Sequence, residues 1–141
     1  MNIIDFSLKI AIEAHGGQVD KAGKPYILHP IRLMMKLDDE KVMSAAILHD
    51  VIEDSNFTEE DLRSKGIPDD VIDAVLCLTK KVNEPYDAFI DRVLKNKIAS
   101  RVKIADIEDN MNILRLYSLS DEDLKRLKKY HEAWKKLKAS V

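Results

Sequence analysis

The sequence predicts an all-α protein: a single domain, residues 1–141, built from about seven or eight helices. Apolar residues recur at helical spacing through most of the chain, and only four glycines and four prolines interrupt it. No segment of useful length alternates between apolar and polar residues, as a half-buried strand would. A chain of this length also fits one compact core better than two.

The first helix is expected over about residues 3–15, because several apolar residues of this segment share one helical face. These residues are Ile4, Leu8, Ala11 and Ile12. A polar, glycine-containing loop follows and extends to Pro25. Pro30 is tolerated in the first turn of a helix, which predicts that a second helix begins near His29.

Capping residues predict where the next three helices begin. Asp38 or Asp39 can cap a third helix through a side-chain hydrogen bond. Thr58 is followed three residues later by Asp61, an approximate capping box that opens a short helix. Pro68 is expected to open the following helix, whose apolar residues then face inward.

Three helical segments are expected in the last third of the chain. One lies near residues 86–96, and another, over about 98–116, has an apolar side. Ser120 caps the final helix, residues 120–139, which has acidic residues in its first turn and lysines toward its end. Acids first and bases last is the order that the helix dipole favours.

Composition excludes several classes of protein. Lys and Arg number 23 against 25 Asp and Glu, a net charge of −2, which predicts no nucleic-acid partner and no membrane-surface partner. No stretch approaches the roughly 18 apolar residues of a membrane span, and the first 15 residues do not resemble a signal peptide. A cytoplasmic protein is the simplest expectation. Cys77 is the single cysteine, so no internal disulfide can form.

The segment "AAILHDVIEDS" places His49, Asp50, Glu53 and Asp54 at the end of an apolar helix. Three acids so close together repel one another unless solvent, a cation or protonation relieves them. Imidazole and carboxylate groups together suit Mn, Fe or Zn. Because adjacent residues point about 100° apart on an ideal helix, His49 and Asp50 can reach one ion only near a helix end. The alternative is a helix terminus whose acids are simply solvated.

One metal ion would need further ligands, since this segment does not contain a complete set. His29 in "YILHP" and Asp106 in "VKIADIEDN" are the candidates. Taken alone, either side chain fits a capped or ion-paired structural residue better than a ligand, and the sites gain weight as ligands only together. Arg101 and Lys103 either surround an anionic ligand near Asp106 or pair with the acids that follow it.

Four segments in order resemble the HD superfamily of metal-dependent phosphohydrolases, specifically its RelA/SpoT-type alarmone hydrolase branch. They are "AHGGQVDKAGKPYILHP", "AAILHDVIEDS", "VLCLTK" and "RVKIADIEDNMNIL", and the resemblance covers about residues 1–116. It implies a helical HD domain and hydrolysis of the 3′-pyrophosphate of ppGpp or pppGpp to GDP or GTP. It also implies one divalent ion, usually manganese, held by His29, His49, Asp50 and Asp106.

In the same family pattern, Glu53 and Asp54 activate or place the attacking water. Lys21, Lys80 and Asn110 match positions that contact a phosphorylated guanosine substrate. The resemblance thus implies a small-molecule partner, while Trp134 either anchors the final helix or contributes to a homo-oligomer contact.

The chain departs from the family pattern on the substrate side. Asp20 stands where the family has a base-stacking arginine, and Ile107 replaces another arginine. Glu108 and Asp109 replace a leucine and a histidine, which is expected to add two negative charges beside the phosphate site. Two alternatives therefore stay open: hydrolysis of another nucleotide or phosphorylated metabolite, and a metal-holding binding module without catalysis.

Overall fold

The computed structural model describes residues 1–141 and is helical throughout, as predicted. The nearest approach to sheet structure is one bridge between Val19 and Pro25 in the loop after α1. The helices are α1 (Ile3–His15), α2 (Leu28–Met35), α3 (Glu40–Leu48), α4 (Val51–Asp54), α5 (Glu59–Ser64), α6 (Asp69–Leu78), α7 (Tyr86–Leu94), α8 (Lys97–Asn110), the 3-10 turn η1 (Ile113–Arg115) and α9 (Asp121–Ser140). The expected seven or eight helices are confirmed when α3 and the single turn α4 count as one interrupted helix.

The predicted caps begin the helices. Asp39 accepts hydrogen bonds from two backbone amides at the start of α3. Thr58 and Ser120 form complete capping boxes at α5 and α9. Pro68 lies directly before α6. Such side chains satisfy amide groups that the first helical turn leaves without a partner, which explains why helix starts are readable in the sequence.

One predicted boundary was wrong. The helix expected over residues 98–116 ends at Asn110, and a separate 3-10 turn follows. Asn112, between them, has φ −80° and ψ 79°, outside the helical region. Asparagine is a poor helix former because its side chain competes for backbone hydrogen bonds. This early end turns the chain away before α9 begins.

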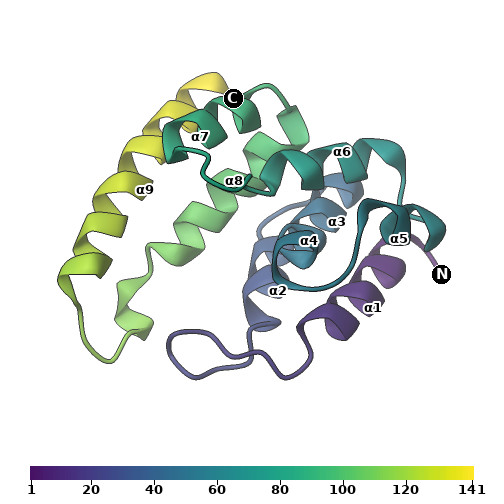
Figure 1. Cartoon of the computed structure of the whole chain (residues 1–141), viewed down its shortest axis with the longest axis horizontal. Coiled ribbons are helices and arrows are strands. Elements are labelled where there is room, and N and C mark those ends of the chain that lie inside the picture. The colour runs from purple at the N-terminus through teal and green to yellow at the C-terminus, as the bar shows by residue number, and fades with distance from the viewer.

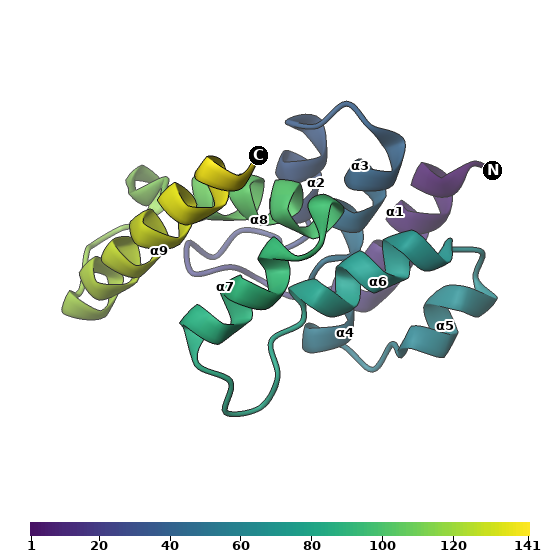
Figure 2. The same ribbon diagram turned by 90° about the horizontal axis from the view of Figure 1, so that it is seen from above.

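Helix α3 lies at the centre of the molecule and packs against α1, α2, α6 and α8. Figure 1 shows α1 and α5 at one end of the bundle and α9 at the other, and Figure 2 shows the same arrangement from above. Ala45 and Ala46 are fully buried, so neighbouring helices can approach the α3 backbone closely. Helix α8 in turn contacts α9, which therefore lies on the side of the bundle away from α1.

Replacing Leu48 with alanine is expected to lower the free energy of unfolding by roughly 2–5 kcal/mol, because Leu48 is fully buried and its truncation leaves a cavity. Urea unfolding followed by circular dichroism measures this loss. Leu114 is 92% exposed, so Leu114→Ala is the control and is expected to change stability by less than about 0.5 kcal/mol. Equal effects of the two substitutions would contradict the central position of α3.

None of these helices combines the length and the apolar character needed to cross a membrane. The longest, α9, has 20 residues and is rich in lysine.

Candidate active site

A break in the helix positions the His-Asp pair. Helix α3 ends at Leu48, and Asp50, with φ −106° and ψ 2°, separates it from α4. On an unbroken helix the two side chains would diverge by about 100°. Here His49 Nε2 lies 3.1 Å from Asp50 Oδ2. The expectation that this pair lies at a helix end is confirmed.

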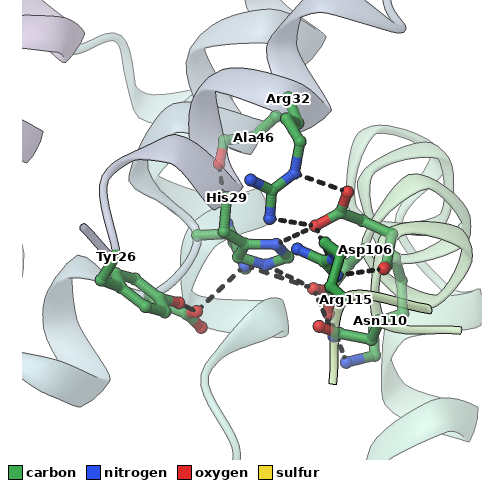
Figure 3. Close-up of polar contacts among 11 residues, drawn as sticks. Tyr26, His29, Arg32, Ala46, Asp106, Asn110 and Arg115 are labelled. Carbon is green, nitrogen blue, oxygen red and sulfur yellow. Dashed lines mark hydrogen bonds and ion pairs between the residues drawn. The ribbon is translucent and has the colours of Figure 1, made fainter. Parts of the chain in front are cut away.

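Three of the four predicted metal ligands converge. His29 of α2, His49 and Asp106 of α8 are buried, and their ligand atoms all lie within 4.8 Å of one another. Asp106 Oδ1 is 2.9 Å from His29 Nε2 and 3.6 Å from His49 Nε2. Asp50 lies beside this group, where its carboxylate accepts a hydrogen bond from the Tyr26 hydroxyl. Figure 3 shows Tyr26, His29 and Asp106 around this centre.

The hydrogen bonds on the far side of each imidazole suit a metal ligand. His49 Nδ1 donates to the Ala46 carbonyl oxygen at 2.7 Å, and His29 Nδ1 donates to Asp109 Oδ2 at 2.6 Å. Both rings can therefore present an Nε2 lone pair to the cluster. His49 Nε2 is buried and has no hydrogen-bond partner. An unpartnered nitrogen beside carboxylates fits a divalent ion such as manganese, iron or zinc.

The cluster concentrates opposite charges away from solvent. Burial by itself raises the pKa of Asp106, but Lys103, His29 and His49 outweigh burial and lower that pKa well below its usual range. Burial likewise lowers the pKa of His49, yet Asp50 and Asp106 raise it well above the ordinary value. The ionised carboxylates suit a cation, and an ion that bound here would displace the protons that these raised pKa values favour on the imidazoles, because a ligating histidine is neutral.

The predicted catalytic acids lie on the solvent side of this centre. Glu53 lines a cavity, and its Oε1 accepts a hydrogen bond from the Lys80 amide at 2.9 Å. Desolvation raises the pKa of Glu53, and the charges of Asp50 and Asp54 add to the shift. Desolvation and Asp50 raise the pKa of Asp54 as well. Asp54, however, lines neither of the two main cavities.

Two cavities open from the cluster. One has a volume of about 570 Å³ and the other about 530 Å³. Asp50, Lys103, Asp106 and Tyr130 line both, so the two cavities meet at Asp50 and Asp106. An elongated ligand could therefore extend to both sides of the cluster.

The predicted substrate residues divide between these cavities. Lys21 and Asn110 line the first, and Lys80 lines the second. Asn110 Nδ2 also donates to Asp106 Oδ1 at 3.1 Å, so Asn110 contacts the buried His-Asp cluster. The Lys21 ammonium lies 3.7 Å from Asp123 Oδ1 and is largely exposed.

The three replacement residues of α8 lie in three different environments. Ile107 is buried in the core. Glu108 is exposed and accepts a hydrogen bond from Trp134 Nε1 at 3.0 Å. Asp109 is buried and bonded to Arg32 and His29. Of the two negative charges expected beside the phosphate site, Asp109 does lie next to His29, where Arg32 neutralises it, whereas Glu108 points outward.

Lys103, which the sequence left between two roles, pairs with Asp106 of the buried cluster. Its Nζ lies 2.9 Å from Asp106 Oδ2. Arg101 instead points outward, 3.5 Å from Asp38. Of the two alternatives left open by the sequence, pairing of these cations with Glu108 and Asp109 is therefore not the one observed.

Several cavity residues had not been singled out. Tyr26, Arg32 and Arg126 line the first cavity, and Tyr130 lines both. Arg126 and Tyr130 are four residues apart, a spacing that places both on one face of α9. That spacing was the available signal, but the sequence does not show that this face is the one directed at α8.

Comparisons with known proteins support the resemblance. No family model matches the chain. It is 37% identical over 120 residues to a guanosine-3′,5′-bis(diphosphate) 3′-pyrophosphohydrolase of Haemophilus influenzae, which covers 74% of this chain and 18% of that protein. It is 35% identical over 121 residues to the bifunctional (p)ppGpp synthase/hydrolase SpoT of Escherichia coli K12, covering 74% of this chain and 17% of that protein.

The chain thus spans less than a fifth of the length of these curated relatives. Among solved structures, it matches a metazoan ortholog of SpoT that hydrolyzes ppGpp with a TM-score of 0.80 and 24% identity, over 97% of this chain and 85% of that one. This second likeness establishes the fold. The chain is therefore a homologue of the SpoT/RelA-type ppGpp hydrolase domains and has their all-helical fold.

Proposed function

We propose that the chain is a metal-dependent phosphohydrolase that removes the 3′-pyrophosphate of ppGpp or pppGpp to leave GDP or GTP. One observation carries this proposal: the buried residues His29, His49 and Asp106 converge where two cavities meet, with His29 lining the first, His49 the second and Asp106 both. The sequence relatives named for ppGpp pyrophosphohydrolysis support the choice of substrate.

The proposed metal site consists of His29, His49, Asp50 and Asp106, with manganese as the proposed ion. When bound, a divalent ion supplies a water of lowered pKa and neutralises charge on the phosphoryl oxygens. Tyr26 would hold Asp50 through its hydrogen bond to that carboxylate.

We assign proton handling to Glu53, with Asp54 helping to place the attacking water. Glu53 lines the second cavity next to Asp50, and the Lys80 amide fixes one of its oxygens. A carboxylate whose pKa is raised toward neutral accepts a proton more readily from water than an ordinary one. The other oxygen of Glu53 is left for that proton.

Cations of α8 and α9 would bind the phosphate groups. Lys129 lines the second cavity together with Lys103 and Lys80. Burial first, and then the charges of Arg126, Lys103 and Lys80, lower the pKa of Lys129. Because like charges that face one cavity destabilise one another, a polyanion relieves them. The polar residues Lys21 and Asn110 would contact the other part of the nucleotide in the first cavity.

We include α9 in the proposed domain, residues 1–141, because two of its residues line the site. Arg126 and Tyr130 lie beyond the segment that resembles the family, yet both line the first cavity. Tyr130 also lines the second. We propose that α9 closes the side of the site that faces α8.

One observation favours a second candidate, hydrolysis of another phosphorylated nucleotide. Asp20 lines the first cavity, and its Oδ1 accepts hydrogen bonds at 2.9 Å from the amides of Ala22 and Lys24. This carboxylate stabilises its own loop and offers no guanidinium plane to a base. A base other than guanine therefore stays a candidate at this cavity.

Hydrolysis assays with metal-free protein and added Mn²⁺, Mg²⁺ or Zn²⁺ test the proposal. The substrates are ppGpp, pppGpp, NADPH and a panel of other nucleotides, with Asp50→Asn as the matched inactive variant. Release of pyrophosphate from ppGpp by the unmodified chain alone is the expected result. Turnover of other compounds only would favour the second candidate, and metal binding without any turnover would indicate a binding module.

A further inference from the structure

Asp109, at the end of α8, uses both carboxylate oxygens inside the protein. Its Oδ1 accepts from Arg32 Nε at 2.8 Å, and its Oδ2 accepts from Arg32 Nη2 at 3.0 Å. The same Oδ2 accepts from His29 Nδ1 at 2.6 Å. The Asp109 side chain is only 6% exposed, so solvent provides no substitute for these partners. Figure 3 shows Arg32, His29 and Arg115 close to one another.

The bond to His29 determines which nitrogen of that ring faces the cluster. A histidine that donates its Nδ1 proton to a carboxylate keeps its Nε2 lone pair for a ligand, and the carboxylate makes that nitrogen more basic. His29 Nε2 points toward Asp106, 2.9 Å from its Oδ1. Asp109 therefore acts on the proposed metal site from outside it, through His29.

The other partners of Asp109 belong to the first cavity. Arg32 and Arg115 both line that cavity. Arg115 Nη2 donates to the Asp109 backbone oxygen at 2.6 Å and lies 3.6 Å from its Oδ2. A bidentate contact with a carboxylate holds a guanidinium in one plane and one direction. Asp109 thus fixes how Arg32, and to a lesser degree Arg115, is presented to a ligand.

We propose that Asp109 is a positioning residue that couples the metal ligand His29 to the two arginines of the first cavity. This coupling is particular to chains with an acid at this position, because the histidine of the family pattern could not form a bidentate ion pair with Arg32. The proposal rests on the metal site proposed above, for which His29 is a ligand.

Calorimetric titration of metal-free protein with Mn²⁺ tests the metal side of this coupling. Asp109→Ala is expected to weaken Mn²⁺ binding by about 10- to 100-fold, the usual effect of removing a carboxylate that orients a ligating histidine. Asp109→Asn keeps one oxygen that can accept the His29 proton, so part of the affinity should return. Glu108→Gln, one residue earlier and exposed, is the matched control and should bind Mn²⁺ like the unmodified chain.

Titration with inorganic pyrophosphate tests whether Asp109 also positions the arginines of the first cavity. Arg32→Met should weaken pyrophosphate binding while changing Mn²⁺ affinity by less than about threefold, because the His29–Asp109 bond remains. Asp109→Ala should weaken the binding of both pyrophosphate and Mn²⁺. Thermal melting of each metal-free variant separates these effects from loss of fold, and Asp109→Asn serves if the alanine variant does not fold.

The two proposals fail in different ways. If Asp109→Ala and Asp109→Asn bind Mn²⁺ and pyrophosphate as tightly as the unmodified chain, the positioning role is overturned and the metal site stands. If the unmodified chain binds no Mn²⁺, both the metal site and the role of Asp109 are overturned.

Discussion

Replacing Asp106 with asparagine is expected to abolish divalent-metal binding and to reduce ppGpp hydrolysis to background. Asp106 is the acidic member of the converging cluster, and its Oδ1 faces both histidine Nε2 atoms. Asparagine has nearly the same shape but carries no charge and is a much weaker ligand. Calorimetric titration with Mn²⁺ and release of pyrophosphate from ppGpp measure the two losses.

The same substitution should destabilise the metal-free protein by roughly 3 kcal/mol or more, because it leaves the Lys103 ammonium buried without its counter-ion. Asp73 is exposed on α6, so Asp73→Asn is a matched control with the same change of charge. It is expected to change neither metal binding nor hydrolysis. Retention of full metal affinity by Asp106→Asn would contradict the assignment of the cluster.

Replacing Lys103 with methionine is expected to lower kcat/KM for ppGpp by about 10²- to 10³-fold, the range seen when one preorganised charge or donor is removed from a reacting centre. The Lys103 side chain is only 12% exposed and lines both cavities beside Asp106. Methionine has a similar length and shape, so the main change is the lost charge. Steady-state assays with saturating Mn²⁺ measure this effect.

Metal binding distinguishes this variant from the Asp106 variant. Lys103→Met should keep or increase Mn²⁺ affinity, because the substitution removes a cation that competes for Asp106. Lys125, with a 77% exposed side chain, is the control, and Lys125→Met should leave kcat/KM unchanged. An unaltered kcat/KM in Lys103→Met would rule out a role in phosphate binding, and lost metal affinity would show that Lys103 instead supports the cluster.

Helix starts and the His-Asp break were readable from the chain because they depend on nearby residues. Thr58 and Asp61 cap α5 through hydrogen bonds three residues apart. The end of α8 was not readable, because apolar residues continue past Asn110 while the backbone at Asn112 leaves the helix. Apolar spacing therefore placed the end of this helix about six residues too late, at 116 instead of Asn110.

The predicted metal ligands of the candidate site could be identified from the sequence, whereas the contacts of the residues around them could not. His29, His49, Asp50 and Asp106 were identified from motifs, and three of these four converge as expected. The pairing of Asp109 with Arg32 was not predicted, since this partner lies 77 residues earlier in the chain. Charge counted along the sequence could not anticipate a contact between α2 and α8.

By itself, the sequence determined the helical class, most helix starts and the residues with metal-binding chemistry, because apolar periodicity and capping act over a few residues. Only the tertiary structure decided that α9 brings Arg126 and Tyr130 to the first cavity and that Asp109 faces inward. Those outcomes depend on which helix faces meet when α2, α8 and α9 pack. Helix packing involves residues far apart in the chain, so the local spacing of residues does not predict which helix faces come into contact.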